Sequence, residues 1–309
     1  PIIRSRCAQS GLGYHNTNWN RNMELRKATR KKAKIRLGYS SVSGGGKTYS
    51  ALLTAKGLCG DWSKVAIIDS ENNSADLYAH LGDFNVLPLS APFSPERYIE
   101  AIRSCEKAGM EVIIIDSITH EWDGKGGCLE IVESLGGKYQ DWAKVTPRHQ
   151  AFIDAILQSP SHIITTVRRK QDYEMTKDDK GKVKVEKGGL REITREGFEY
   201  ELTINLELDS RHNATASKDR TGLFMGKPAF VPSEKTGELI AKWCEQGEEA
   251  FGVIKPGSDW YTWVEACNTQ RELVELYNKH KAEVDGNPLL QQLIAGRRNT
   301  INGKTLAAA

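Results

Sequence analysis

The sequence predicts an α/β fold in which a mostly parallel sheet is covered by helices on both faces. Apolar runs that read as buried strands alternate along the chain with helix-like segments, and short loops join them. Such alternation is typical of parallel sheets, because each connecting helix packs back on a face of the sheet. Beyond residue 247 the composition changes to consecutive helix-like segments. We therefore expect a core over residues 23–247 and a small helical module over residues 248–309.

The first predicted strand and helix flank a glycine-rich loop. Residues 34–37 read as the strand and residues 49–56 as the helix, and residues 40–48 read Ser-Ser-Val-Ser-Gly-Gly-Gly-Lys-Thr. This order is typical of a P-loop, whose glycines let backbone N–H groups surround the β- and γ-phosphates of a nucleoside triphosphate. A flexible Gly/Ser linker would contain the same residue types, but it would not need the strand and the helix beside it.

The loop supplies most of the expected nucleotide-binding residues. We expect consecutive residues to bind the nucleotide, namely Ser43, Gly44, Gly45, Gly46, Lys47, Thr48 and Tyr49. Lys47 would also act in catalysis by placing a positive charge beside the phosphates, and the Thr48 hydroxyl would hold Mg²⁺. One position departs from the pattern G-x-x-x-x-G-K-[ST], since Ser41 stands where the first glycine is expected.

The later elements follow from the same periodicity. We expect further strands at residues 64–71, 85–90, 111–116, 162–167, 200–208 and 214–217, and further helices at residues 95–109, 142–157, 260–267, 270–284 and 288–298. Residues 170–198 interrupt this rhythm, because they are charged, contain glycine and are long for a connection. They form either a mobile functional loop or a small β-excursion.

Two of the predicted strands end in carboxylates. Asp116 ends the most hydrophobic strand, and Glu71 ends the strand before it. Parallel strands deliver their carboxyl ends to one crevice, so both side chains can face the triphosphate. We assign Asp116 as the acid linked to Mg²⁺ and Glu71 as the general base or water-orienting group of hydrolysis. Asp69 lies on the same face as Glu71 and competes for that role, and Asp116 could instead cap the next loop.

Two pairs of cations follow later strands. Arg168 and Arg169 end the strand at residues 162–167, where a polar group could contact the nucleotide and sense its γ-phosphate; they could equally be surface residues. Lys218 and Arg220 are two residues apart on an extended segment, so they point the same way and can act on one anion. If they cannot reach their own P-loop, they could complete a neighbour's site; the alternative is a solvated turn.

The order of these parts resembles the RecA-type ATPase core. Residues 66–82 resemble the RecA strand that ends in the catalytic glutamate, and residues 112–118 resemble its Walker B strand. Further similarity to phage-encoded members of the AAA family, which are associated with single-strand annealing recombination, is found at residues 119–130, 142–157 and 196–200. The resemblance covers roughly residues 33–245.

The resemblance implies ATP bound with Mg²⁺ at subunit interfaces of a homo-oligomer that assembles on single-stranded DNA. It supports Glu71 as a catalytic residue, and it matches Lys218 and Arg220 to paired lysines that act in catalysis across the RecA interface. The RecA sensor glutamine falls near Val167, so Thr166 or Arg168 would have to replace it. The long DNA-pairing extensions of RecA are missing, which argues against complete strand exchange.

Composition adds little about partners. The formal net charge is +3, but residues 26–36 carry seven basic residues and no acid, and residues 168–187 are cationic with Tyr173 available to stack on a base. No apolar stretch approaches the ~18 residues of a membrane span. The six cysteines form no C-x-x-C pair and no Cys/His cluster at zinc-ligand spacing, as in a reduced cytoplasmic protein. Residues 1–22 read as a disordered or non-native leader before Met23.

Together with the residues of the predicted site, the resemblance implies an ATP hydrolase that depends on Mg²⁺ and is stimulated by DNA, working in phage recombination, annealing or replication in the host cytoplasm. A P-loop ATPase that acts as a regulatory or assembly switch without nucleic acid is the main alternative. A small-molecule kinase would need an acceptor pocket that the sequence does not indicate. A degenerate nucleotide-binding scaffold is suggested by Ser41 alone.

Overall fold

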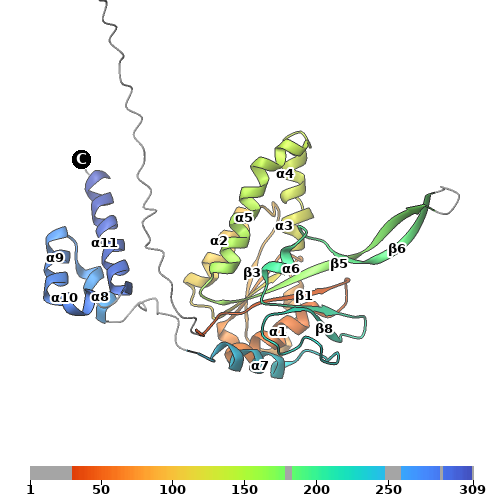
Figure 1. Ribbon diagram of the computed structural model, residues 1–309, viewed down its shortest axis with the longest axis horizontal. Helices are drawn as coiled ribbons and strands as arrows, with labels where there is room; N and C mark the ends of the chain where they lie inside the picture. Colours follow the sequence, from red (N-terminus) through yellow and green to blue (C-terminus); the bar gives the residue numbers. More distant parts are fainter. Residues whose placement is uncertain (1–29, 178–182, 248–258, 286–287, 308–309) are drawn as a thin grey trace, which may run out of the picture.

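The centre of the protein is a twisted sheet with the strand order β3-β2-β4-β5-β1-β7-β8 (Figure 1). The computed structural model describes residues 30–177, 183–247, 259–285 and 288–307. The strands are β1 (Arg36–Ser41), β2 (Val65–Asp69), β3 (Asn85–Pro88), β4 (Val112–Asp116), β5 (His162–Lys177), β6 (Val183–Glu192), β7 (Ile204–Leu208) and β8 (Ala214–Asp219).

The sheet is parallel except at β8 and at the β5–β6 pair. Strands β1, β2, β3, β4, β5 and β7 pair in parallel, whereas β8 pairs with β7 in the antiparallel sense. Strand β5 lies between β1 and β4. The carboxyl ends of all the parallel strands therefore meet at one edge, and the residues that follow β1, β2, β4 and β5 are brought together there.

Helices cover both faces of the sheet (Figure 1). Helices α1 (Lys47–Cys59) and α7 (Glu234–Cys244) pack on one face, and α2 (Pro95–Lys107) and α5 (Trp142–Gln158) pack on the other. The strands are apolar on both faces because each face contributes to a separate buried core. The predicted α/β fold is thereby confirmed.

Two glycines let α1 and α7 cross at close range. A Cβ atom on Gly57 would lie 1.9 Å from the Glu234 carbonyl oxygen, and one on Gly237 would lie 2.1 Å from the Thr54 carbonyl oxygen. Any side chain at either position would collide with the backbone of the other helix. This crossing fixes the direction of α1, which begins at the glycine-rich loop.

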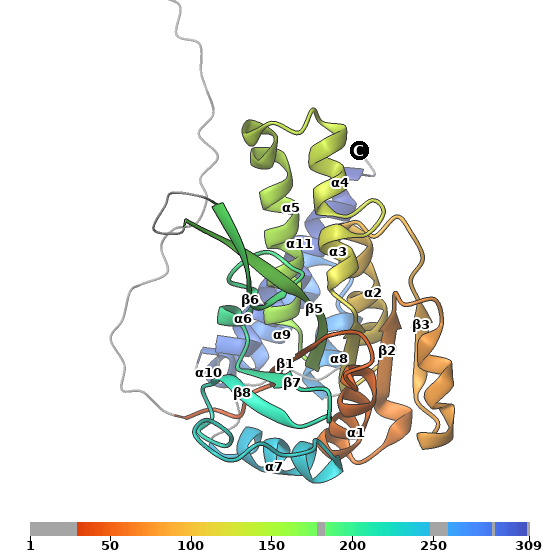
Figure 2. The ribbon, with the colours of Figure 1, turned by 90° about the vertical axis from the view of Figure 1, so that its right-hand side faces the viewer.

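The segment after residue 167 is a β-hairpin, which is the second of the two predicted alternatives. Strand β5 continues well beyond its parallel part and pairs with β6 in the antiparallel sense, so the hairpin projects away from the sheet (Figures 1 and 2). The strand expected at residues 200–208 was wrong at its start. Phe198–Glu201 forms the short helix α6 and buries Phe198 in a core, and β7 begins only at Ile204.

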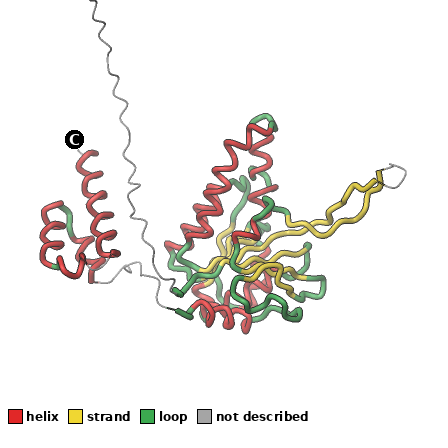
Figure 3. Tube along the Cα trace, in the orientation of Figure 1, coloured by secondary structure: helices red, strands yellow, loops and turns green. Residues whose placement is uncertain are grey.

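Helices follow one another after residue 258, as Figure 3 shows in red. They are α8 (Asp259–Ala266), α9 (Gln270–Lys279), α10 (Lys281–Asp285) and α11 (Pro288–Ala307). A small apolar cluster around Val264 and Leu273 joins α8, α9 and α11. The predicted leader at residues 1–22 and part of the basic run 26–36 lie outside the described residues. None of the described helices has both the length and the apolar composition needed to cross a membrane.

Candidate functional site

The loop between β1 and α1 has the backbone geometry of a phosphate cradle. Gly44 and Gly46 have φ values of 78° and 83°, which side-chain-bearing residues rarely adopt. A Cβ atom on Gly46 would also lie 2.5 Å from His212 Nδ1, so there is no room for one. The N–H groups of the first turn of α1 have no helical partner and face the loop, which makes this end of α1 suited to an anion.

Ser41 is accommodated in place of the expected first glycine. It lies in extended backbone at the end of β1, and its buried hydroxyl donates a hydrogen bond to the Leu208 carbonyl oxygen at 2.9 Å. A Cβ atom on Gly45 would lie 1.9 Å from Ser41 Oγ. A side chain at position 45 would collide with Ser41, so glycine is required there. Gly45 does not line the cavity that the rest of the loop faces. Ser41 therefore anchors the loop through its hydroxyl, while Gly44 and Gly46 keep their positive φ values.

Lys47 is buried beneath the loop. Its side chain is 7 % exposed, and Nζ donates to the Val42 carbonyl oxygen at 3.0 Å. Burial lowers the pKa of Lys47, while the negative charges of Asp116 and Glu71 act against that shift. Its ammonium group is thus held within the loop, where a triphosphate would receive its charge.

Asp116 ends β4 and is held by two hydroxyls. Thr48 Oγ1 donates to Asp116 Oδ2 at 2.6 Å, and Thr166 Oγ1 donates to the other carboxylate oxygen. Burial raises the pKa of Asp116, and the two hydroxyl donors oppose this. A carboxylate and a hydroxyl at this spacing form a donor set suited to Mg²⁺, which binds few protein oxygens and keeps several waters. Their role as metal-binding residues stays a prediction.

Glu71 lies just beyond β2 and is paired with Arg168. Arg168 Nε donates to Glu71 Oε1 at 2.9 Å, and both side chains are partly exposed. Burial alone would raise the pKa of Glu71, but the hydrogen bond and charge of Arg168, together with Lys47, lower it overall. Glu71 is therefore ionised and faces the P-loop, as a base or water-orienting group requires.

Asp69 is not free to act as the competing base. Its Oδ1 accepts the Glu71 N–H at 2.6 Å and its Oδ2 accepts the Ala75 N–H at 2.8 Å, and the residue is 2 % exposed. Both oxygens hold the backbone turn that follows β2. The geometry therefore favours Glu71 over Asp69.

Arg168 occupies the place expected of a nucleotide sensor. Val167 is fully buried in a core, whereas Arg168 faces the loop, level with Ser41 in the register of β5 and β1. The Arg168 N–H donates to Thr119 Oγ1 at 2.9 Å, which fixes its backbone. Of the two residues predicted to replace the sensor glutamine, Thr166 contacts the buried Asp116 carboxylate and Arg168 lines the cavity beside the P-loop.

Most of the predicted nucleotide-binding residues line one cavity of about 440 Å³, whereas Gly45 and the buried Asp116 do not. From the predicted set, the cavity is lined by Ser43, Gly44, Gly46, Lys47, Thr48, Tyr49, Glu71 and Arg168. Sequence reasoning missed further lining residues, namely Ser50, Ser74, Tyr78, His212, Val231 and Pro232. His212 follows β7 at the same sheet edge as the P-loop, and this position could have indicated from the sequence that it lines the site. No sequence signal indicated Val231 or Pro232.

Lys218 and Arg220 lie elsewhere in the chain. Both donate to the carbonyl oxygen of Tyr200, so they point the same way, as their spacing predicts. Lys218 pairs with Asn205, which lies beside Gly38 in β1, some residues before the P-loop. Neither lines the cavity of its own chain. Their catalytic role across a subunit interface stays a prediction.

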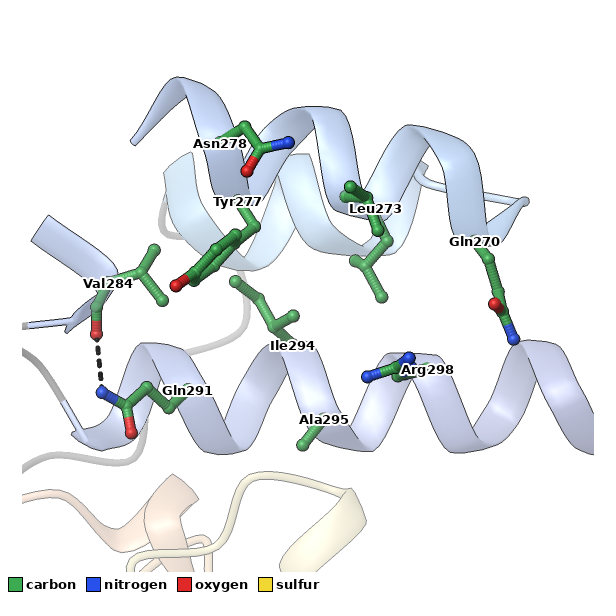
Figure 4. A pocket seen from close by; sticks show the side chains of 10 residues that line it. Gln270, Leu273, Tyr277, Asn278, Val284, Gln291, Ile294, Ala295 and Arg298 are labelled. Carbon is green, nitrogen blue, oxygen red and sulfur yellow. Dashed lines mark hydrogen bonds between the residues drawn. The ribbon is translucent and has the colours of Figure 1, made fainter. Parts of the chain in front are cut away.

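A second cavity of about 440 Å³ lies between α9 and α11 (Figure 4). Leu273, Tyr277 and Ile294 point into it, and Gln291 is tied to the Val284 carbonyl oxygen at 3.1 Å. Its described lining contains one cation, Arg298, and no carboxylate, histidine or cysteine. It therefore lacks the groups that bind a metal–triphosphate.

Comparison with known protein families matches the part of the chain that contains the first cavity. A family model described as an AAA domain (AAA_24) matches residues 33–231. The matched range begins just before β1, ends at Val231 and includes all the described residues that line the first cavity except Pro232. A search of the curated proteins found no match.

Proposed function

The chain belongs to the AAA-domain family, and from that premise we propose that it is an Mg²⁺-dependent ATPase that binds single-stranded DNA. It would act in phage DNA recombination or annealing, or in replication, in the cytoplasm of the host cell. Membership of this family supports a P-loop that binds and hydrolyses a nucleotide. The observation that carries the rest of the chemistry is the convergence of Lys47, Thr48, Glu71 and Asp116 on one end of the sheet.

The residues in and beside the cavity would have different roles in hydrolysis. The loop N–H groups and Lys47 would hold the β- and γ-phosphates, and Thr48 and Asp116 would hold Mg²⁺. When bound, Mg²⁺ neutralises negative charge on the phosphates. Glu71 would orient a water toward the γ-phosphate and accept its proton, since its carboxylate faces the cavity and is ionised.

The Arg168–Glu71 pair supports a switch between two states. In the structure the guanidinium neutralises Glu71. A γ-phosphate in the cavity would compete for Arg168 and release Glu71 for catalysis. Because Arg168 lies in β5, which continues into the β5–β6 hairpin, this exchange would reach the projecting hairpin.

Replacing Arg168 tests this exchange. We expect Arg168→Ala to raise the pKa of Glu71, because the cation that lowers it is lost. Hydrolysis requires the ionised carboxylate, so the acid limb of the pH profile of kcat/KM, which reports the free enzyme in which Arg168 pairs with Glu71, should move to higher pH. Steady-state turnover measured across pH checks this, with Arg103→Ala on α2 as a control; an unmoved limb in Arg168→Ala would refute the coupling.

The hairpin is the element that supports contact with DNA. At its base a groove of about 840 Å³ is lined by Arg169, Arg191 and Arg195 and by the aromatic rings of Trp122 and Tyr200. Cations beside aromatic rings are typical of single-strand binding surfaces. The side chain of Tyr173, predicted to stack on a base, lies outside the described residues.

The same groove also favours the alternative function. Its lining includes five acids, namely Asp172, Glu192, Glu196, Glu199 and Glu207, against four cations. Such mixed charge fits a protein surface at least as well as a phosphate backbone. A regulatory or assembly switch without nucleic acid is therefore the second candidate.

One experiment separates the two candidates. We would measure ATP turnover with and without single-stranded DNA, and particle size with and without ATP. Stimulation by DNA, reduced in the double variant Arg191→Ala/Arg195→Ala, supports DNA binding. Turnover that is unaffected by any DNA, together with ATP-dependent assembly, supports the switch.

Shared sites make a separate prediction. If ATP lies between the subunits of a homo-oligomer, Arg220→Ala should reduce turnover by about tenfold or more, because a cation that faces the neighbour's phosphates is lost. Mixing this variant with Lys47→Ala should then restore part of the activity, since each supplies what the other lacks. Wild-type turnover in Arg220→Ala alone would remove the role across the interface.

A further inference from the structure

A buried cluster of three potential metal ligands lies beyond the end of β4. Glu121 is on α3 (Thr119–Asp123), Cys128 begins α4 (Cys128–Ser134), and His149 is on α5. Their ligand atoms all lie within 4.8 Å of one another. The sequence showed no zinc-ligand spacing, because these residues come from three helices that only the fold brings together.

The three side chains already meet at one point. Cys128 Sγ donates to Glu121 Oε1 at 3.1 Å, and His149 Nδ1 lies 3.1 Å from each oxygen of the Glu121 carboxylate. The exposed fractions of Glu121, Cys128 and His149 are 0 %, 0 % and 4 %. A carboxylate, a thiol and an imidazole removed from water together need either shared protons or a shared cation.

We propose that Glu121, Cys128 and His149 bind a Zn²⁺ ion. Zinc accepts this mixture of sulfur, nitrogen and oxygen ligands. Bonds of about 2.0–2.3 Å in a tetrahedral site separate the ligand atoms by roughly 3.3–3.8 Å. The present contacts of 3.1 Å would have to open only slightly to admit the ion.

Charge balance favours the ion in this buried place. A thiolate, a carboxylate and a neutral imidazole carry two negative charges, which Zn²⁺ cancels. On binding, the Cys128 S–H bond breaks, a sulfur–zinc bond forms, and the proton passes to solvent. His149 would bind through Nδ1, with its ring proton on Nε2.

The surroundings are aromatic. Trp122 stacks on Trp142 with ring centroids 5.5 Å apart, and its ring lies against His149 at 5.5 Å. Both tryptophans also line a surface cavity of about 830 Å³, whereas none of the three proposed ligands lines it. Within the described residues the cluster has no fourth His, Cys, Asp or Glu, so water would complete the site.

The ion would hold together the helices that follow Asp116, the carboxylate proposed to bind Mg²⁺. Helix α3 begins three residues after Asp116, and its first residue, Thr119, accepts the N–H of Arg168. Zinc would tie α3 to α4 and α5 through Glu121. We therefore expect the ion to steady the backbone of Arg168, which Thr119 holds.

The test uses full-length protein stripped of metal. One equivalent of Co²⁺ should produce the near-ultraviolet absorption of a sulfur–cobalt bond, and Zn²⁺ should displace it. Elemental analysis of the protein as purified, before the metal is removed, should find one Zn²⁺ per chain, and Zn²⁺ added to the stripped protein should raise its melting temperature. The sulfur signal distinguishes this site from the P-loop site, whose described lining contains no cysteine.

Variants assign the ligands. Cys128→Ser should lose the absorption, and Glu121→Gln should lose Zn²⁺ retention. Cys105→Ser, which alters another buried cysteine outside the cluster, should keep both. Absence of the absorption and of any melting shift in folded wild-type protein would overturn the proposal and leave a proton-bonded triad. Persistence of the absorption in Cys128→Ser would overturn it equally, and neither result bears on ATP hydrolysis.

Discussion

Lys47→Ala is expected to reduce ATP turnover by at least about a hundredfold, comparable to the loss of a charge-stabilising donor in other active sites. Lys47 is the cation buried under the P-loop, with Nζ hydrogen-bonded to the Val42 carbonyl oxygen. Its removal leaves the phosphates without the nearest positive charge. Nucleotide affinity, measured by titration with a fluorescent ATP analogue, should fall as well.

Lys56→Ala is the matched control for this change. Lys56 lies on the same helix, but its side chain bonds the Gly60 carbonyl oxygen at the opposite end of α1. It should leave affinity and turnover close to wild type. Equal losses in both variants would point to damage to α1, and wild-type turnover in Lys47→Ala would contradict the assignment.

Glu71→Gln is expected to retain ATP binding and to lose hydrolysis by about 10²–10⁴-fold, the range of a lost general base. Glutamine keeps the size of the side chain, but it cannot accept a proton from water. Single-turnover measurements with bound ATP would separate the chemical step from binding.

Glu207→Gln controls for loss of an arginine-paired carboxylate near the same edge. Glu207 lies in β7 and pairs with Arg169 at 2.5 Å, but it does not line the ATP cavity. Turnover without DNA should remain near wild type in this variant. Full turnover in Glu71→Gln would remove Glu71 as the base.

The fold could be predicted because apolar runs and helical periodicity are local signals. The buried strand β4 and the helix α2 with Pro95 in its first turn were both visible in the sequence. The β5–β6 hairpin could be predicted only as one of two alternatives, because a polar segment fits a loop as well as a strand pair, and the turn of α6 was missed. Helix α7 was also missed, although Ser233 and Thr236 form a capping box at its start.

The site was predictable where a residue lies at or next to the boundary of an element whose type was evident. Lys47, Glu71 and Asp116 were found in this way, and parallel topology explains why they meet. His212 and the Glu121–Cys128–His149 cluster were missed, because their partners come from separate elements and no spacing rule joins them. The positions of Lys218 and Arg220 against Tyr200 likewise depend on the register of β8, which the sequence does not encode locally.

The central claim is that one metal–triphosphate is held by Lys47, Thr48 and Asp116 and attacked from the side of Glu71. Structure determination of Glu71→Gln with ATP and Mg²⁺ tests it most directly. The account predicts γ-phosphate beside Lys47, Mg²⁺ bound to Thr48 Oγ1 with the Asp116 carboxylate next to it, and a water between Gln at position 71 and the phosphate. Nucleotide bound away from the glycine-rich loop, or Mg²⁺ distant from both Thr48 and Asp116, would contradict it.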